Sequence, residues 1–115
     1  MDELVEFSKS RGAGGLVWIA LMGKPTSLDA LSGEHIKSPV SRIISVESVK
    51  SIASRTGARV GDLVLIIAGQ PKSTNVAISA LRNEMGKRLD LADPDLLSFV
   101  FVVDFPLFEL SLIHI

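Results

Sequence analysis

The alternation of apolar and polar positions divides the chain into short helices and short strands. In residues 2–11, Leu4 and Phe7 are three positions apart, a spacing that places both side chains on one face of a helix. The glycine-rich run 12–15 ends this helix, because glycine adopts turn conformations without steric cost. Residues 16–21 are nearly all apolar, which predicts a strand that is either covered on both faces or packed along one edge.

The middle of the chain predicts a loop, two helices and a strand. Residues 23–37 are polar and predict a loop, and Pro39 with Val40 predicts a helix start in which Val40, Ile43 and Ile44 are buried. Ser45 is the expected N-cap of a second helix, at residues 46–56. Gly57 then ends this helix, and residues 62–68 form a strand rich in Val, Leu and Ile.

The last third predicts a long helix, a turn and a final strand. Residues 73–89 carry apolar side chains four positions apart and end with basic residues, as a helix C-terminus favours. Residues 93–95 (DPD) predict a turn, and residues 99–103 (FVFVV) predict a strand. Together these elements predict an α+β fold, a two-layer sandwich with helices on one face of a small, mainly antiparallel sheet.

The composition indicates a globular domain. The 115 residues suffice for one domain, and 47% of them are hydrophobic and 22% charged, which is ordinary globular usage. The net charge of −1 differs from the strong positive charge of a domain that mainly grips a phosphate backbone. No apolar run approaches the roughly 20 residues of a membrane-spanning helix, and the absence of cysteine suits the cytoplasm.

The residues themselves identify no reaction. His35 lies in a polar loop without a second ligand nearby, so we interpret it as a solvated side chain. The glycines at 12–15 precede a strand, whereas phosphate-binding loops follow a strand and open a helix. Asp104 follows an expected strand, a place where functional acids and ordinary turn acids both occur.

Further charged residues also have simple structural interpretations. Asp93 and Asp95 flank a proline, and turn formation explains both without a metal. Arg82, Lys87 and Arg88 alternate with acidic residues, which favours a solvated helix face over a nucleic-acid patch.

Five segments, in order along the chain, resemble the insertion domain of bacterial-type aspartyl-tRNA synthetases. They are residues 12–19 (GAGGLVWI), 38–42 (SPVSR), 55–64 (RTGARVGDLV), 80–89 (ALRNEMGKRL) and 102–109 (VVDFPLFE). The last segment resembles the point where that family's chain returns to its class II catalytic domain. The resemblance implies a GAD insertion domain at residues 1–97 and the start of the returning catalytic domain at residues 98–109.

The activity that the resemblance implies is that of a longer parent protein. That parent would attach aspartate to tRNA with ATP and Mg²⁺, in the cytoplasm, as a homodimer with no membrane association. None of the three class II motifs matches a position here, so no catalytic, cofactor-binding or metal-binding residue is carried over. The fragment alone is therefore expected to be inactive and to bind no cofactor, and its expected role is to shape the approach of the tRNA acceptor end.

Two alternatives are weighed beside this one. The GAD domain also occurs in the B-type subunit of the tRNA-dependent amidotransferase, although residues 102–109 resemble the synthetase instead. The other alternative is a stand-alone interaction domain with no link to tRNA. Residues 110–115 (LSLIHI) resemble a translated transposon mosaic-end adaptor, so they are expected to be a sequencing scar outside the fold.

Overall fold

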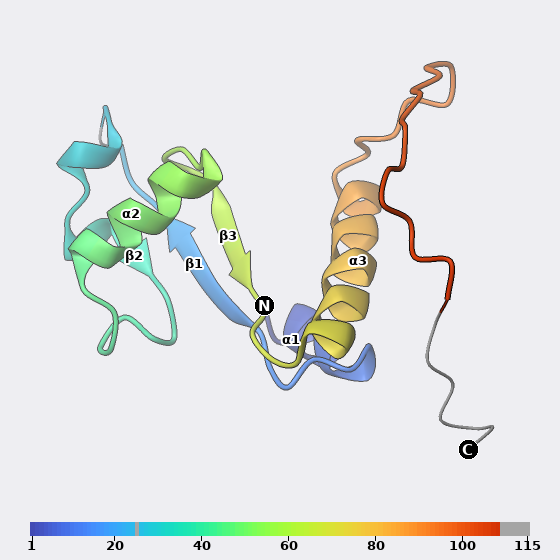
Figure 1. The fold of residues 1–115 in the computed structure, drawn as a ribbon. Helices are drawn as coiled ribbons and strands as arrows, with labels where there is room; N and C mark the ends of the chain where they lie inside the picture. Colours follow the sequence, from blue (N-terminus) through green and yellow to red (C-terminus); the bar gives the residue numbers. More distant parts are fainter. Residues whose placement is uncertain (25, 109–115) are drawn as a thin grey trace.

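A computed structural model describes residues 1–24 and 26–108 of the chain. The expected scar at residues 110–115 therefore lies outside the described residues. The described part is α+β, with three α-helices and a three-stranded antiparallel sheet in the order β2-β1-β3. The strands are β1 (Val17–Leu21), β2 (Ile36–Lys37) and β3 (Leu63–Ile66), and Figure 1 shows β1 between the other two.

The three helices begin and end close to the positions that the sequence predicts. They are α1 (Asp2–Ser10), α2 (Val46–Thr56) and α3 (Pro71–Arg88). The hydroxyl of Ser45 accepts a hydrogen bond from Ser48 N and caps α2. Gly57 ends α2 with φ of +69°, a left-handed conformation that glycine adopts most easily.

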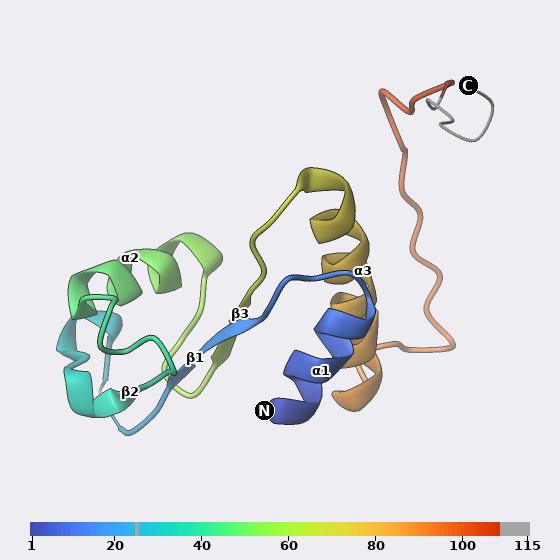
Figure 2. The ribbon, with the colours of Figure 1, turned by 90° about the horizontal axis from the view of Figure 1, so that it is seen from below.

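The helices cover both faces of the sheet, so the predicted arrangement with helices on one face is wrong. Successive residues of a strand point to opposite faces. Val64 and Ile66 pack in a core with α2, whereas Leu65 and Ile67 pack in a second core with α1 and α3. Figures 1 and 2 show α2 on one side of β1 and β3, with α1 and α3 on the other. The physical reason is that β3 is apolar at every position, so both of its faces are covered.

Each core is small, and each draws on the residues whose spacing predicts burial. In the α2 core the buried residues are Ile19, Leu21, Leu31, Val49, Ala53 and Val64. In the other core they are Leu4, Leu16 and Leu81, and the partly buried Phe7 and Met85 pack against them. The i, i+3 and i, i+4 spacings of α1 and α3 are therefore confirmed.

The region between β1 and α2 differs from the prediction in two ways. The expected loop at residues 23–37 contains two 3₁₀ turns, Leu28–Ala30 and Gly33–His35, and the two-residue β2. Strand β2 exists because β1 offers it an edge, where Ile36 pairs with Leu21. The local sequence carries no sign of that pairing.

The expected helix start at Pro39 forms turns only. Val40 O accepts hydrogen bonds from Ile43 N and Ile44 N, but Ser45 is extended, with ψ of 156°, so no helix continues through it. Ile43 is consequently 84% exposed, and the expectation that it is buried is wrong.

The predicted strand at residues 99–103 is not formed in this structure. The chain from residue 89 to residue 108 has no helix or strand, and its apolar side chains are exposed, reaching 98% at Phe101. Figures 1 and 2 show this segment on the far side of α3 from the sheet. A strand forms only beside a partner edge, and no strand of the described residues pairs with residues 99–103.

Candidate functional site

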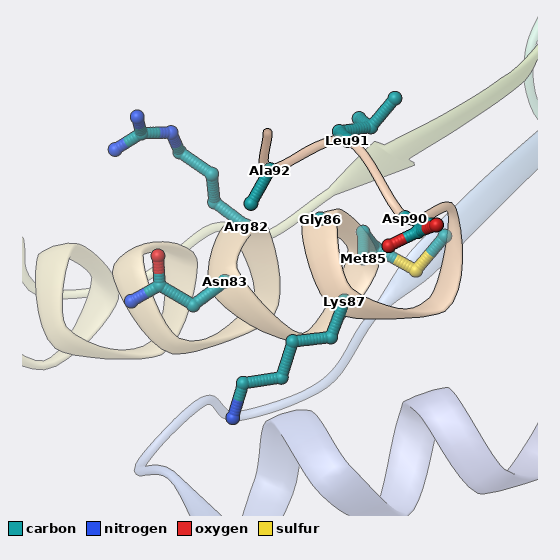
Figure 3. Close-up of a pocket in the computed structure, with 8 residues that line it drawn as sticks. All are labelled: Arg82, Asn83, Met85, Gly86, Lys87, Asp90, Leu91 and Ala92. Atoms are coloured by element: carbon teal, nitrogen blue, oxygen red, sulfur yellow. The ribbon is translucent and has the colours of Figure 1, made fainter. Parts of the chain in front are cut away.

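Three of the open hollows in the described residues border α3 or β3. One, of about 860 Å³, lies over the last turns of α3 and is shown in Figure 3. A second, of about 640 Å³, runs along β3 and is bordered by Met85 and Leu89 of α3. A third, of about 240 Å³, lies where Phe7 and Arg11 approach α3.

The basic residues around the first hollow do not converge on one point. Arg82 and Lys87 both line it, but Figure 3 shows them pointing to different sides of α3, with Lys87 on the side of α1. The same hollow also contains the acidic Asp90. Phosphate binding requires several cations on one surface, so this geometry favours the solvated face that the sequence predicts.

Arg88, the third basic residue of this group, is part of an ion-pair network that the sequence does not reveal. Its Nε donates to Glu84 Oε1 at 2.9 Å and its Nη2 donates to Glu3 Oε1 at 2.7 Å. The hydrogen bond to Glu84, followed by the one to Glu3, raises the pKa of Arg88 above its ordinary value. Arg88 therefore connects α3 to α1 and is not a free cation of the surface.

His35 has a structural role in a turn. Its Nδ1 accepts a hydrogen bond from Ser32 N at 3.2 Å and lies 3.0 Å from Ser32 Oγ, so it caps the 3₁₀ turn Gly33–His35. The sequence interpretation as a purely solvated side chain is incomplete, because a histidine three positions after a serine can reciprocate the cap.

The acidic candidates are turn residues. Asp93 Oδ1 accepts a hydrogen bond from Asp95 N at 2.9 Å, which confirms the predicted turn. Asp104 has a positive φ of 53°, a conformation that aspartate tolerates better than most residues, and it lies in the exposed segment after residue 98. No cavity surrounds either group among the hollows described above.

The glycine-rich run also acts as a helix stop. Gly12 has φ of +98°, and its N–H donates to Lys9 O at the end of α1. Its amide is thus used in closing the helix, as the sequence predicts, and not in holding a phosphate.

No metal centre is apparent in residues 1–24 and 26–108, where no three His, Asp or Glu side chains gather closely enough to hold an ion. Within the same residues, none of the helices combines the length and the apolar character needed to cross a membrane. The prediction that this chain contains no catalytic, cofactor-binding or metal-binding residue stays a prediction.

Comparison with known proteins identifies the domain. The sequence profile of the GAD domain matches residues 1–78, which include α1, the whole sheet, α2 and the first half of α3. A longer stretch of 108 residues is 44% identical to an aspartate–tRNA(Asp/Asn) ligase of Dehalococcoides mccartyi strain BAV1. That match covers 94% of this chain and 18% of the relative.

Other relatives give the same result at lower identity. An aspartate–tRNA(Asp/Asn) ligase of Thermoanaerobacter sp. strain X514 is 41% identical over 109 residues, and one of Geotalea uraniireducens is 34% identical over 109 residues. In both comparisons the match covers 95% of this chain and 17% of the relative. The chain thus spans less than a fifth of these curated relatives, and by the profile match over residues 1–78 it belongs to the GAD domain family.

Proposed function

We propose that this chain is the GAD insertion domain of an aspartate–tRNA ligase, together with the first residues of the returning catalytic domain. The observation that carries the proposal is the length of the similarity. The match with the Dehalococcoides ligase spans 108 residues against 78 for the GAD profile, a difference of 30 residues. The added length reaches beyond the domain that ligases and amidotransferases share.

The sequence motifs support the domain boundaries that we propose. Residues 1–97 are the insertion domain, and residues 98–109 are the start of the catalytic domain, followed by an adaptor scar at 110–115. The exposure of Phe99 and Phe101 supports this division, because so much uncovered apolar surface is unusual in a self-contained domain. In the full protein these side chains would be covered by catalytic-domain partners.

The parent protein would carry the activity. It would attach aspartate to tRNA with ATP and Mg²⁺ in the cytoplasm and act as a homodimer. The relatives are named for both tRNA(Asp) and tRNA(Asn), and we extend both substrates to the parent. We expect the chain by itself to be inactive, because none of the three class II motifs matches a position in it. The domain would shape the approach of the tRNA acceptor end.

The decisive test is to sequence outward from both ends of this coding region in its source DNA. The proposal expects class II motifs on both sides, and ATP-dependent aspartylation of tRNA by the protein expressed from the full reading frame. That activity should be absent from the chain of 115 residues. A flanking sequence without class II motifs would overturn the assignment as a ligase. The assignment to the GAD family would still hold.

The amidotransferase alternative makes a different prediction for the same experiment. A GAD domain of that subunit would be followed by amidotransferase sequence and not by a class II catalytic domain. The resemblance of residues 102–109 to the synthetase re-entry segment and the ligase names of the relatives above favour the ligase.

A further inference from the structure

Met85 lies at the margin of the core that α1 and α3 form against the sheet. The apolar row of α3 consists of Ala77, Leu81 and Met85, each four positions after the one before. Ala77 and Leu81 are buried, whereas Met85 is only partly buried and packs against the buried cluster of Leu4, Leu16 and Leu81. The row that holds α3 in place therefore meets solvent at Met85.

Two open hollows border the Met85 side chain. It lines the hollow of about 860 Å³ over the last turns of α3 and also the hollow of about 640 Å³ along β3. Figure 3 shows its sulfur at the end of α3, among the residues of the first hollow. A small dissolved molecule, such as a peroxide, can therefore approach the sulfur while the domain stays folded.

The thioether of methionine reacts with peroxides by transfer of one oxygen atom. The sulfur lone pair forms the new S–O bond, the O–O bond of the peroxide breaks, and the departing hydroxide takes up a proton and leaves as water. The thioether is oxidised to a sulfoxide, and the peroxide is reduced. The sulfoxide oxygen is a polar acceptor in place of an apolar sulfur, so it packs poorly among leucine side chains.

The other sulfur atoms of the chain lie outside the two cores. The sequence has three methionines and no cysteine. Met1 is 43% exposed and Met22 is 50% exposed, and neither belongs to a core of the described residues or packs against one. Oxidation at these two positions leaves the packing of the cores unchanged, so the consequences of oxidation are concentrated at Met85.

We propose that Met85 is a redox-sensitive site, at which oxidation to the sulfoxide by a peroxide weakens the packing of α3 against α1 and the sheet. The same reaction is reversible, because methionine sulfoxide reductases return the sulfoxide to the thioether. The inference concerns the residues that form this core and is independent of the proposed ligase function.

Thermal unfolding of the chain before and after treatment with hydrogen peroxide tests this proposal. Peptide mass spectrometry measures the addition of one oxygen atom at each methionine. The melting temperature should fall by about 4–8 °C as the sulfoxide of Met85 accumulates. Treatment of the oxidised chain with methionine sulfoxide reductases should restore the original melting temperature, a result that requires no substitution in the protein.

Two matched variants assign the effect to one sulfur. Met85→Leu keeps an apolar side chain of similar volume, so its fold is retained and peroxide should leave its melting temperature unchanged. Met22→Leu removes the sulfur of the exposed Met22, and this variant should lose as much melting temperature in peroxide as the unaltered chain does. Circular dichroism before treatment checks that both variants are folded.

Three results would overturn the proposal. Met85 could remain unoxidised under conditions that oxidise Met22 completely. The sulfoxide of Met85 could form without a change in melting temperature, or Met85→Leu could lose as much melting temperature in peroxide as the unaltered chain does.

Discussion

Arg88 and Glu3, 85 positions apart in the chain, form an ion pair in which Arg88 Nη2 donates to Glu3 Oε1 at 2.7 Å. The pair joins the last turn of α3 to the first turn of α1, and Glu84 holds the same guanidinium from within α3. These two helices together form the core on one face of the sheet, and the ion pair links them at the surface.

Replacing either partner should lower the melting temperature slightly. We expect Arg88→Gln or Glu3→Gln to lower Tm by about 1–4 °C, since exposed ion pairs contribute little and salt screens them. The double variant should lose less than the sum of the two single losses. Thermal unfolding at low and high salt measures both effects, and strictly additive losses would show that the pair has no coupling energy.

This ion pair should be insensitive to pH in the alkaline range that proteins tolerate. The pKa of Arg88 is raised in the folded state, chiefly by Glu84. A raised pKa stabilises the folded chain fully below the ordinary pKa of arginine, and that contribution is lost only above it. The Tm difference between the unaltered chain and Arg88→Gln should therefore be the same at pH 7 and pH 9, and a difference that shrinks at pH 9 would contradict this.

Ser8 carries the polar side chain whose removal should stabilise the protein. It is fully buried in α1, and its hydroxyl has no hydrogen-bond partner among the described residues. Ser8→Ala should raise the free energy of unfolding by about 1 kcal/mol, because an unsatisfied buried hydroxyl is removed. Ser10→Ala is the matched control, since Ser10 Oγ donates to Phe7 O at 2.7 Å at the surface. Urea denaturation should show no gain for the control; a loss of stability in Ser8→Ala would mean that its hydroxyl is satisfied in solution.

Two glycine replacements should have opposite effects. Gly57 has φ of +69° at the end of α2, so Gly57→Ala should destabilise the fold by about 1 kcal/mol despite open space around it. Gly86 lies inside α3 with a helical backbone, and an added Cβ would meet nothing within 4 Å. Gly86→Ala should therefore stabilise by about 0.5–1 kcal/mol. Urea denaturation of both variants tests the pair, and effects of the same sign would contradict it.

Ending the chain after Leu97 should improve solubility. Residues 98–108 contribute eight large apolar side chains whose exposure is 70% or more: Phe99, Val100, Phe101, Val102, Val103, Phe105, Leu107 and Phe108. Such a segment exposes strand-forming surface and invites association. The soluble fraction after expression of residues 1–97 should exceed that of residues 1–115, and equal fractions would show that the segment is not responsible.

Local signals in the sequence predict most of the helices. The Ser45 hydroxyl caps α2, Gly57 ends it, and the spacing of Ala77 and Leu81 identifies the buried side of α3. These features depend on neighbours within one or two turns, so periodicity and capping residues are sufficient to find them. The turn at Asp93 is predictable for the same reason.

The candidate site is predictable only in part. The sequence indicates that Arg82 and Lys87 form a solvated face, and their divergence in Figure 3 agrees with this. It does not reveal that Arg88 pairs with Glu3, because nothing near α1 or α3 in the sequence records their contact. It also does not reveal the open edge of β3, since a strand becomes an edge only when the sheet order is known.

The sequence by itself determined the α+β class, the position of each α-helix and, through its motifs, the GAD family to which the chain belongs. Only the tertiary structure decided that helices cover both faces of the sheet, that Ile36 joins it as β2, and that residues 99–103 remain unpaired. The physical reason is the distance along the sequence over which each interaction acts. Helix hydrogen bonds and caps are local, whereas strand pairing and face coverage depend on which distant segment supplies an edge or an apolar surface.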